Sequence, residues 1–399
     1  MERSSRDLST TAIVPTFNRA PLVAECLKAI LGQSLPPAQI IVVDDGSEDH
    51  TAETLRRFES RIEVIKMPNR GKSAGVNLAL SRASHPLIWI VDDDDIVLPE
   101  ALAILTGLIR SEPDAGFAYG RYHRFAVDEE SRDRRIFDTG YWRRCSPGDF
   151  LTATLEDMFV HQPGMLVWRD CYDRAGPYDE SLPRSQDYDM LIRLARITRP
   201  VSTEAAVFLQ RQHEGDRGPA SQRFGADERM SRWMEADRTI LQRCYAELEL
   251  SEYLPDGHCK NPQHQRQALL QRGTIMARKK LWNLALQDFE AASDLGGAML
   301  SEAEDRILKR AVLSKYGCDE LFQDQRISQS IIGLGKRSET GRQIARALSR
   351  GLMRRTKEQL RAARPLKAGR YAGLTLSWML GSPRTIRSTT SPNHGSGVP

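Results

Sequence analysis

The sequence predicts an α/β fold: a doubly wound, mostly parallel sheet followed by a mainly α-helical C-terminal region. Three observations support this. Strand and helix signals alternate through the first 120 residues, and the strand segments are continuous apolar runs rather than alternating ones. Such runs are typical of parallel strands covered by helices on both faces. Strand signals then end near Pro219, and residues 226–363 have mainly helical patterns.

The first strands share a feature that bears on function. Each apolar run ends abruptly in a polar cluster, and ligands of parallel sheets bind outside the carboxyl ends of the strands. We therefore expect the clusters to meet at one edge of the sheet. The runs are residues 12–15, 40–43 and 87–91, and the clusters that follow them are 16–19, 44–47 and 92–95.

Helices and further strands are expected between and after these runs. Pro21 suits the first turn of a helix that ends near Gly32, and a later helix carries Leu55 and Phe58. The remaining expected elements are a strand over 62–64, a helix over 71–83, a hairpin or loop over 121–144, a strand over 165–168 and a helix over 187–196.

At 399 residues the chain exceeds a comfortable single core, so several domains are expected. The predicted division is 1–220 for a catalytic domain, 221–335 for a helical domain, 336–380 for a basic amphipathic segment and 381–399 for a disordered tail. Within the helical domain, five residues resemble one tetratricopeptide repeat: Gly273, Leu281, Ala285, Phe289 and Ala292. About three repeats are normally needed for a stable stack, so an ordinary helix pair is favoured.

Charge is distributed unevenly. The net charge is +4, but residues 336–370 hold twelve Lys/Arg against two Asp/Glu. The first domain is therefore not expected to bind nucleic acid. The basic amphipathic stretch 341–380 favours contact with a membrane surface, with a solvated helix face as the alternative.

Cysteine spacing and the N-terminus bear on the compartment. The six cysteines show no paired spacing, residues 1–9 lack an apolar core, and no run reaches the ~18 apolar residues of a membrane span. The sequence thus predicts a cytoplasmic protein, peripheral on the inner face of the membrane if the basic stretch binds lipid.

The aspartate run 92–95 is the strongest chemical signal. Carboxylates crowded at a strand end repel one another unless a cation lies among them. Mg²⁺ and Mn²⁺ prefer one or two carboxylates plus phosphate oxygens, which suits a diphosphate ligand. The alternative is a solvated acidic turn.

Asp44 and Asp45 begin the second cluster and also allow two interpretations. Asp45 or Ser47 is expected to cap the next helix through an Asx turn. Functionally, a carboxylate here can accept hydrogen bonds from a base or a ribose hydroxyl.

Taken in order, these segments resemble the inverting family 2 glycosyltransferases, whose nucleotide-binding fold is called GT-A. The resemblance covers residues 10 to 215. The matching segments are Ile-Val-Pro-Thr-Phe-Asn-Arg at 13–19, Asp-Asp-Gly-Ser at 44–47, Asn-x-Gly-x-Ser-x-x-x-Asn at 69–77, Asp-x-Asp at 92–94 with Pro99 after it, the acceptor-side segments 176–182 and 186–194, and Arg-x-His at 211–213.

The resemblance implies roles for individual residues. Asp187 would be the general base, and Asp92 and Asp94 would hold Mg²⁺ or Mn²⁺. His213 would be a further metal ligand, with a solvated loop residue as the alternative. One departure concerns Gln186, where the family usually has Glu; losing that charge should lower the pKa of Asp187 slightly. The residues implied for the nucleotide sugar are Pro15, Thr16, Phe17, Arg19, Asp44, Asp45, Arg70, Lys72, Asp92 and Asp93.

The implied reaction moves a sugar from a nucleoside-diphosphate donor, with a UDP-sugar favoured, to a glycan or lipid-linked acceptor. Two alternatives remain. Asp93-x-Asp95 after an apolar strand imitates the nucleophile motif of haloacid-dehalogenase-like phosphatases, although that motif normally follows the first strand. The other is a non-catalytic sugar-binding domain on a helical scaffold.

Overall fold

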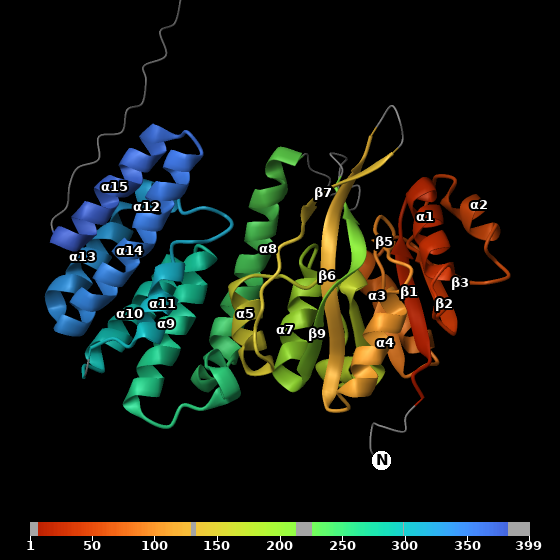
Figure 1. Cartoon of the computed structure of the whole chain (residues 1–399), viewed down its shortest axis with the longest axis horizontal. Coiled ribbons are helices and arrows are strands. Elements are labelled where there is room, and N and C mark those ends of the chain that lie inside the picture. Colours follow the sequence, from red (N-terminus) through yellow and green to blue (C-terminus); the bar gives the residue numbers. More distant parts are fainter. Residues whose placement is uncertain (1–6, 129–132, 213–225, 298, 382–399) are drawn as a thin grey trace, which may run out of the picture. The chain divides into compact units, whose positions relative to one another are not determined.

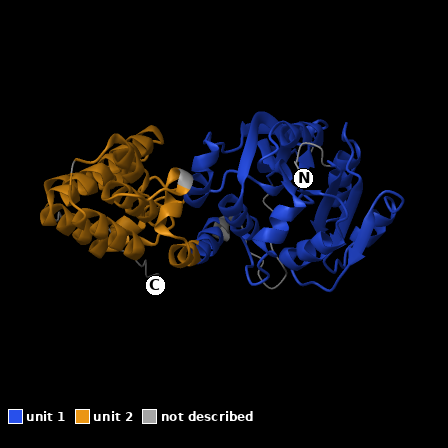
Figure 2. Cartoon of the chain, turned by 90° about the horizontal axis from the view of Figure 1, so that it is seen from below, with its two compact units in different colours: residues 1–240 blue, residues 241–399 orange. Residues whose placement is uncertain are grey.

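The computed structural model describes residues 7–128, 133–212, 226–297 and 299–381. The chain divides into two compact units, residues 1–240 and 241–399 (Figure 2). The boundary lies within helix α8 (Ala226–Glu247), not at 220/221, because the Ser185 hydroxyl bonds Asp237 (3.1 Å) while Tyr245 bonds Asp288 (3.2 Å) in the second unit.

Unit 1 contains a single nine-stranded sheet in the order β3-β2-β1-β4-β8-β6-β9-β5, with β7 paired to β6 (Figure 1). Strands β3, β2, β1 and β4 are parallel to one another, as the apolar runs predict. The strands are β1 (Thr10–Thr16), β2 (Gln39–Asp44), β3 (Glu63–Lys66), β4 (Leu87–Ile90), β5 (Ile96–Val97), β6 (Ala115–Val127), β7 (Arg134–Thr139), β8 (Met165–Trp168) and β9 (Arg199–Arg211).

The helices of unit 1 follow the strands in alternation through its first half. Helix α1 begins with Pro21 in its first turn and ends at Gly32, and it buries Val23, Leu27 and Ile30 in the core. The helices are α1 (Ala20–Leu31), α2 (Thr51–Arg56), α3 (Lys72–Arg82), α4 (Ala101–Ser111), α5 (Phe150–Glu156), α6 (Arg169–Ala175), α7 (Gln186–Ile197) and the first part of α8.

The other half of the sheet is mixed. Strand β8 runs antiparallel to β4 and to β6, and β6 pairs in parallel with β9. Strands β6 and β7 form the hairpin expected over 121–144. The long strand β9 was not predicted, because exposed and buried positions are interspersed along it without a clear period.

Unit 2 is helical. Its helices are α9 (Pro262–Arg278), α10 (Trp282–Asp294), α11 (Glu302–Arg310), α12 (Glu320–Gln323), α13 (Gln325–Arg337), α14 (Glu339–Arg361) and α15 (Pro365–Leu380). The basic segment 336–380 is not separate from it, because α14 packs against α10, α11, α13 and α15. None of these described helices, or those of unit 1, is both long and apolar enough to cross a bilayer.

Helices α9 and α10 form the pair that resembles a tetratricopeptide repeat. They pack closely at Gly273, where an added Cβ would lie 2.7 Å from the Phe289 ring and 3.1 Å from the Ala285 carbonyl oxygen. Three of the five residues of the repeat-like pattern therefore meet at one helix crossing. A side chain larger than hydrogen at 273 would force the two helices apart.

Candidate active site

The polar clusters after β1, β2 and β4 meet at one edge of the sheet, as predicted. The Thr16 hydroxyl donates to Asp93 Oδ2 (2.7 Å), which joins the first cluster to the third. The backbone N–H of Asn18 donates to the Ser47 hydroxyl (2.9 Å), which joins the first cluster to the second. Parallel pairing of β1 with both β2 and β4 brings these strand ends together.

In the second cluster, Asp44 and Asp45 bind backbone amides. Asp44 Oδ1 accepts from the N–H of Ser47 (2.9 Å). The two oxygens of Asp45 accept from the N–H groups of Arg70 and Gly71, both at 2.8 Å. Burial raises the pKa of Asp45, and these two hydrogen bonds oppose the rise. Asp45 thus fixes the loop that leads into α3.

The capping prediction for this cluster was wrong. Helix α2 begins at Thr51, four residues beyond Ser47, and the Thr51 N–H donates to Asp49 Oδ1 (2.9 Å). The Asx turn expected after β2 does form, but it joins Asp44 to Ser47 within the loop instead of starting the helix.

In the third cluster, Arg19 bridges two carboxylates. Its Nη1 lies 2.7 Å from Asp93 Oδ1 and 3.0 Å from Asp94 Oδ2. Burial raises the pKa of Asp93 to about 6, although Arg19 opposes the shift. Asp95 has a different partner, since its Oδ1 accepts from the N–H of Arg211 on β9 (2.9 Å).

Asp92, at the end of the same strand, pairs with Lys72, and 29% of its side-chain surface is exposed. The Lys72 ammonium donates to Asp92 Oδ1 (2.5 Å). Lys72 opens α3 directly after Gly71, whose φ of 92° is a left-handed conformation that favours glycine. Burial lowers the pKa of Lys72, but the carboxylates of Asp92 and Asp187 outweigh burial and raise it.

Asp187 lies in the first turn of α7 and is partly exposed. Its Oδ1 accepts from the N–H of Tyr188 (2.9 Å). Burial raises the pKa of Asp187, Lys72 lowers it, and the negative charge of Asp92 raises it further. A partly exposed carboxylate with a raised pKa, close enough to Lys72 and Asp92 for their charges to act on it, is a candidate general base.

The model of the glycosyl transferase family 2 matches residues 11–175, which include all three strand-end clusters. This N-terminal domain belongs to glycosyl transferase family 2. The matched range ends before α7, so the family model itself does not include Asp187.

Curated relatives agree with this assignment. Glycosyltransferase GlyG of Streptococcus pneumoniae is 33% identical over 134 residues, which are 33% of this chain and 44% of GlyG. Chondroitin synthase of Pasteurella multocida is 24% identical over 188 residues, 46% of this chain and 18% of the synthase. The chain thus spans less than half the length of either relative.

A solved structure shares the fold. Staphylococcus aureus TarS, residues 1–349, solved in complex with UDP-GlcNAc, aligns with a TM-score of 0.51 at 16% identity. The alignment covers 94% of this chain and 92% of TarS 1–349. The GT-A fold predicted from the sequence is confirmed.

The haloacid-dehalogenase-like alternative is overturned by the family match. The structure gives a physical reason as well. Strand β4 is not the first strand, and both aspartates of the imitated motif are buried: Asp93 against Thr16 and Arg19, Asp95 against the Arg211 amide.

In this family 2 domain, contacts that the sequence did not predict join segment 69–77 to segment 176–182. The Asn77 amide on α3 exchanges two hydrogen bonds with the backbone of Tyr178 (2.8 and 3.0 Å) and donates to Glu180 (3.1 Å). Arg70 pairs with the same Glu180 (3.0 Å). Asn77 is the last residue of the Asn-x-Gly-x-Ser-x-x-x-Asn segment. Its partner Tyr178 is 101 residues away in the sequence, and no local pattern indicates this contact.

Asp189, two residues after Asp187, has a structural environment. It is buried and pairs with Arg193 (2.8 Å), and Arg193 also donates to the carbonyls of Ala175 and Gly176 (2.7 and 3.2 Å). Asp189 therefore holds the start of the segment that leads from α6 to α7.

The other predicted residues are placed as follows. Pro15 is buried at the end of β1, and Phe17 is partly exposed in the turn after it. Of the two candidate cations, Lys72 lies against the aspartate cluster, whereas Arg70 turns to Glu180. His213 lies outside the described residues.

Asp92 and Asp94 are the carboxylates that the resemblance implies for a divalent cation. Within the described parts of the chain, no three His, Cys, Asp or Glu side chains converge as a metal site. Asp92 and Asp94 nevertheless each place one oxygen against a cationic side chain, Lys72 and Arg19. One or two carboxylates completed by phosphate oxygens is the arrangement that Mg²⁺ prefers, so these residues fit a metal that arrives with a diphosphate.

Proposed function

We propose that the chain is an inverting glycosyltransferase that moves a sugar from a nucleoside-diphosphate sugar to a hydroxyl of a glycan or lipid-linked acceptor. The observation that carries this proposal is the placement of Asp187 beside the Lys72–Asp92 pair at the carboxyl edge of a family 2 domain. Nucleotide sugars are made in the cytoplasm, so we propose that the domain acts there.

The proposed reaction is a single displacement. The acceptor oxygen attacks the anomeric carbon as its proton passes to an Asp187 carboxylate oxygen, and the bond from that carbon to the diphosphate breaks. Attack from the face opposite the leaving group inverts the anomeric centre. Asp187 is suited to this step because its raised pKa makes it a better proton acceptor than an ordinary aspartate.

We propose that the diphosphate binds between Arg19 and Lys72, the two cations paired with the aspartate cluster. Asp92 and Asp94 would hold Mg²⁺ or Mn²⁺, which supplies positive charge that stabilises the departing nucleoside diphosphate. Asp44 and Asp45 would act by fixing the loop around the nucleotide. TarS binds UDP-GlcNAc, so this donor heads the candidates.

The test is a donor screen. Purified full chain is incubated with UDP-, GDP- and dTDP-sugars, with Mn²⁺ or with excess chelator, and release of nucleoside diphosphate is measured. We expect release from one donor class, dependent on the metal and strongly reduced in Asp187→Asn. Tight donor binding without release or transfer to any acceptor would favour the non-catalytic sugar-binding alternative.

We also propose that unit 2 contacts anionic membranes through the turn between α14 and α15. The apolar face of α14 does not support the broader prediction for 341–380, because Ile344, Leu348 and Leu352 are buried in the helical core. At the turn, Leu360 and Leu366 are 58% and 88% exposed. Exposed basic residues surround them: Lys357, Arg361, Arg364 and Arg370.

Co-sedimentation with phosphatidylglycerol-containing vesicles tests this contact. Binding should weaken with salt, because basic residues near an anionic surface each contribute about 1 kcal/mol that salt screens. Leu360→Ser with Leu366→Ser should reduce binding, and Leu35→Ser, an exposed leucine of unit 1, serves as the control. Unchanged binding by the double variant would exclude the turn.

A further inference from the structure

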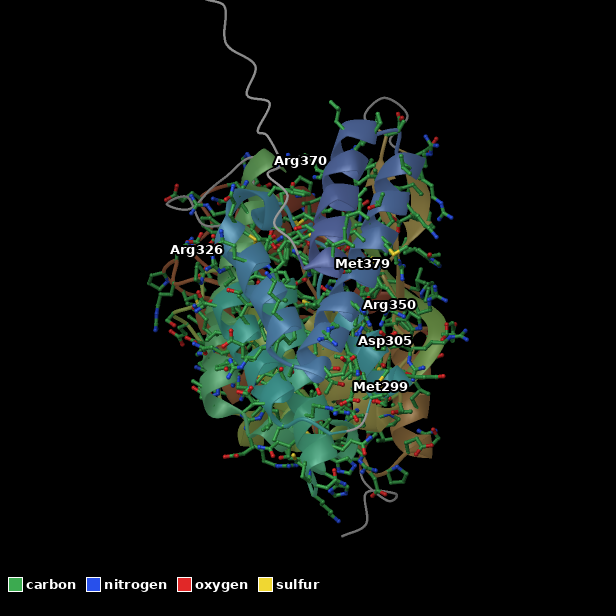
Figure 3. The ribbon with its side chains drawn as sticks, turned by 90° about the vertical axis from the view of Figure 1, so that its left-hand side faces the viewer. Met299, Asp305, Arg326, Arg350, Arg370 and Met379 are labelled. Atoms are coloured by element: carbon green, nitrogen blue, oxygen red, sulfur yellow. The ribbon has the colours of Figure 1, made fainter. Side chains whose placement is uncertain are left out.

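Unit 2 contains a groove of about 510 Å³ between α11 and α14. Four cationic side chains line it against two acidic ones: Arg306, Lys309, Arg346 and Arg350 against Glu302 and Asp305. Three of the lining residues, Met299, Asp305 and Arg350, are labelled close to one another in Figure 3. No part of the proposed transfer reaction uses these residues.

The walls of the groove are held in place by contacts of their own. Asp305 is paired with both Lys309 and Arg350, which fixes two of the cations across the two helices. The start of α11 is fixed to α9, since Glu304 is fully buried and accepts two hydrogen bonds from the Arg266 guanidinium (2.7 and 3.0 Å). The N–H of Leu300, just before α11, donates to Gln343 Oε1 on α14 (2.8 Å).

The remaining two cations are not held by Asp305. Arg306 is 64% exposed, and its guanidinium lies 3.4 Å from Glu302. Arg346 is exposed and makes no hydrogen bond or ion pair with any residue that the structure describes. The groove therefore carries an excess of two positive charges, and two guanidinium groups present planar sets of donors that match the oxygens of a phosphate.

We propose that this groove binds a phosphate group, with the excess of two positive charges balancing a dianionic monoester. Arg306 and Arg346 would donate to the phosphate oxygens, while Arg350 and Lys309, fixed by Asp305, would set the field around it. The phosphate could belong to a soluble ester or to a lipid headgroup; both present the same chemistry to the groove. This proposal does not depend on the transferase activity of unit 1.

The experiment titrates inorganic phosphate into the full chain at low ionic strength and measures heat by calorimetry. The test variant is Arg306→Gln with Arg346→Gln. Because both side chains are exposed, the double variant should fold like the wild type, which its thermal midpoint checks. The matched control is Arg354→Gln, an exposed arginine on α14 that does not line the groove.

We expect saturable binding to the wild type and to Arg354→Gln, and a dissociation constant raised by about tenfold or more in the double variant, since charge-assisted hydrogen bonds are lost. Absence of saturable binding to the wild type would overturn the proposal. So would equal affinity in all three proteins, because phosphate would then bind elsewhere.

A second arm separates the two sources. Glycerol 3-phosphate is compared with vesicles of phosphatidic acid in phosphatidylcholine. If the double variant loses affinity for both, the groove also accepts the lipid headgroup. If it loses affinity for glycerol 3-phosphate alone, the ligand is a soluble ester. If it loses affinity for neither, the groove is not a phosphate site.

Discussion

Two groups of carboxylates stand at the same edge of the sheet, but they are held in different ways. Asp44 and Asp45, after β2, accept hydrogen bonds from backbone amides of loops. Asp92 and Asp94, after β4, face the side chains of Lys72 and Arg19. A backbone amide cannot leave without unfolding its loop, whereas a lysine or arginine head can turn away.

This difference separates the two groups of aspartates. We propose that the carboxylates bound to amides shape the site, whereas those paired with cationic side chains exchange these cations for a metal ion or share them with a diphosphate. The same contrast recurs on α7, where Asp189 is buried on Arg193 while Asp187 is partly exposed near Lys72. The following predictions test this division.

The largest effect is expected for Asp187→Asn. The change keeps the shape of the side chain but removes the proton acceptor, so the rate of transfer should fall by ~10²–10⁴-fold while donor affinity stays constant. Steady-state rates and donor titration measure the two quantities. Asp173→Asn, at an exposed position on α6, is the matched control and should keep the wild-type rate. Full transfer by Asp187→Asn would contradict the assigned base.

Asp189→Asn is not a suitable control, although it differs from the test variant by only two positions. Its buried pair with Arg193 supports the segment between α6 and α7. We expect its replacement to lower thermal stability first and activity only as a consequence.

The next effect concerns Asp94→Ala. In the wild type, UDP at about 100 times its dissociation constant should stabilise the fold by ~2.7 kcal/mol, and excess chelator should remove most of this. In Asp94→Ala, the thermal shift with UDP should be small and equal with Mn²⁺ or with chelator. A chelator-sensitive shift that survives in Asp94→Ala would place the metal elsewhere.

Asp45→Ala should show the opposite behaviour. It leaves the N–H groups of Arg70 and Gly71 without their carboxylate partner, so the free energy of unfolding should fall by about 1–3 kcal/mol without any ligand present. Urea unfolding of the ligand-free protein measures this. Asp94→Ala should cost less in the same measurement, because removing one carboxylate also relieves repulsion within the cluster. Equal losses of unfolding free energy in the two variants would contradict the proposed division between aspartates that hold the fold and aspartates that meet the ligand.

These outcomes depend on features that the sequence predicted to different extents. The parallel strands and the meeting of their polar ends follow from continuous apolar runs, because each run can only be buried in a covered sheet. Strands β6 and β9 were harder to predict from the sequence, because their pairing joins residues about 80 positions apart and leaves part of each strand exposed.

The site itself shows the same limit. Residue types at strand ends predicted which aspartates gather, but not whether an amide or a cation would hold each one. The cap expected from Asp45 or Ser47 failed because the loop uses both residues to bind its neighbours, the 70–71 loop and Asn18. Which groups bind Asp45, Asn77 or Asp189 is decided by tertiary packing, which a local pattern does not contain.

The smallest expected effect sharpens the assignment of Asp187 through its pKa. Because the base works as a carboxylate, activity is lost as the pH falls through its pKa, and burial places that pKa above the ordinary value of an aspartate. Gln186→Glu adds a negative charge next to it, which disfavours the ionised form and raises the pKa further. The acid limb of the pH–rate profile should therefore move to higher pH, by less than about one unit at a partly exposed site. Gln186→Met, which adds no charge, should leave the limb in place. A limb that moves equally in both variants, or moves to lower pH in Gln186→Glu, would show that another group limits the rate.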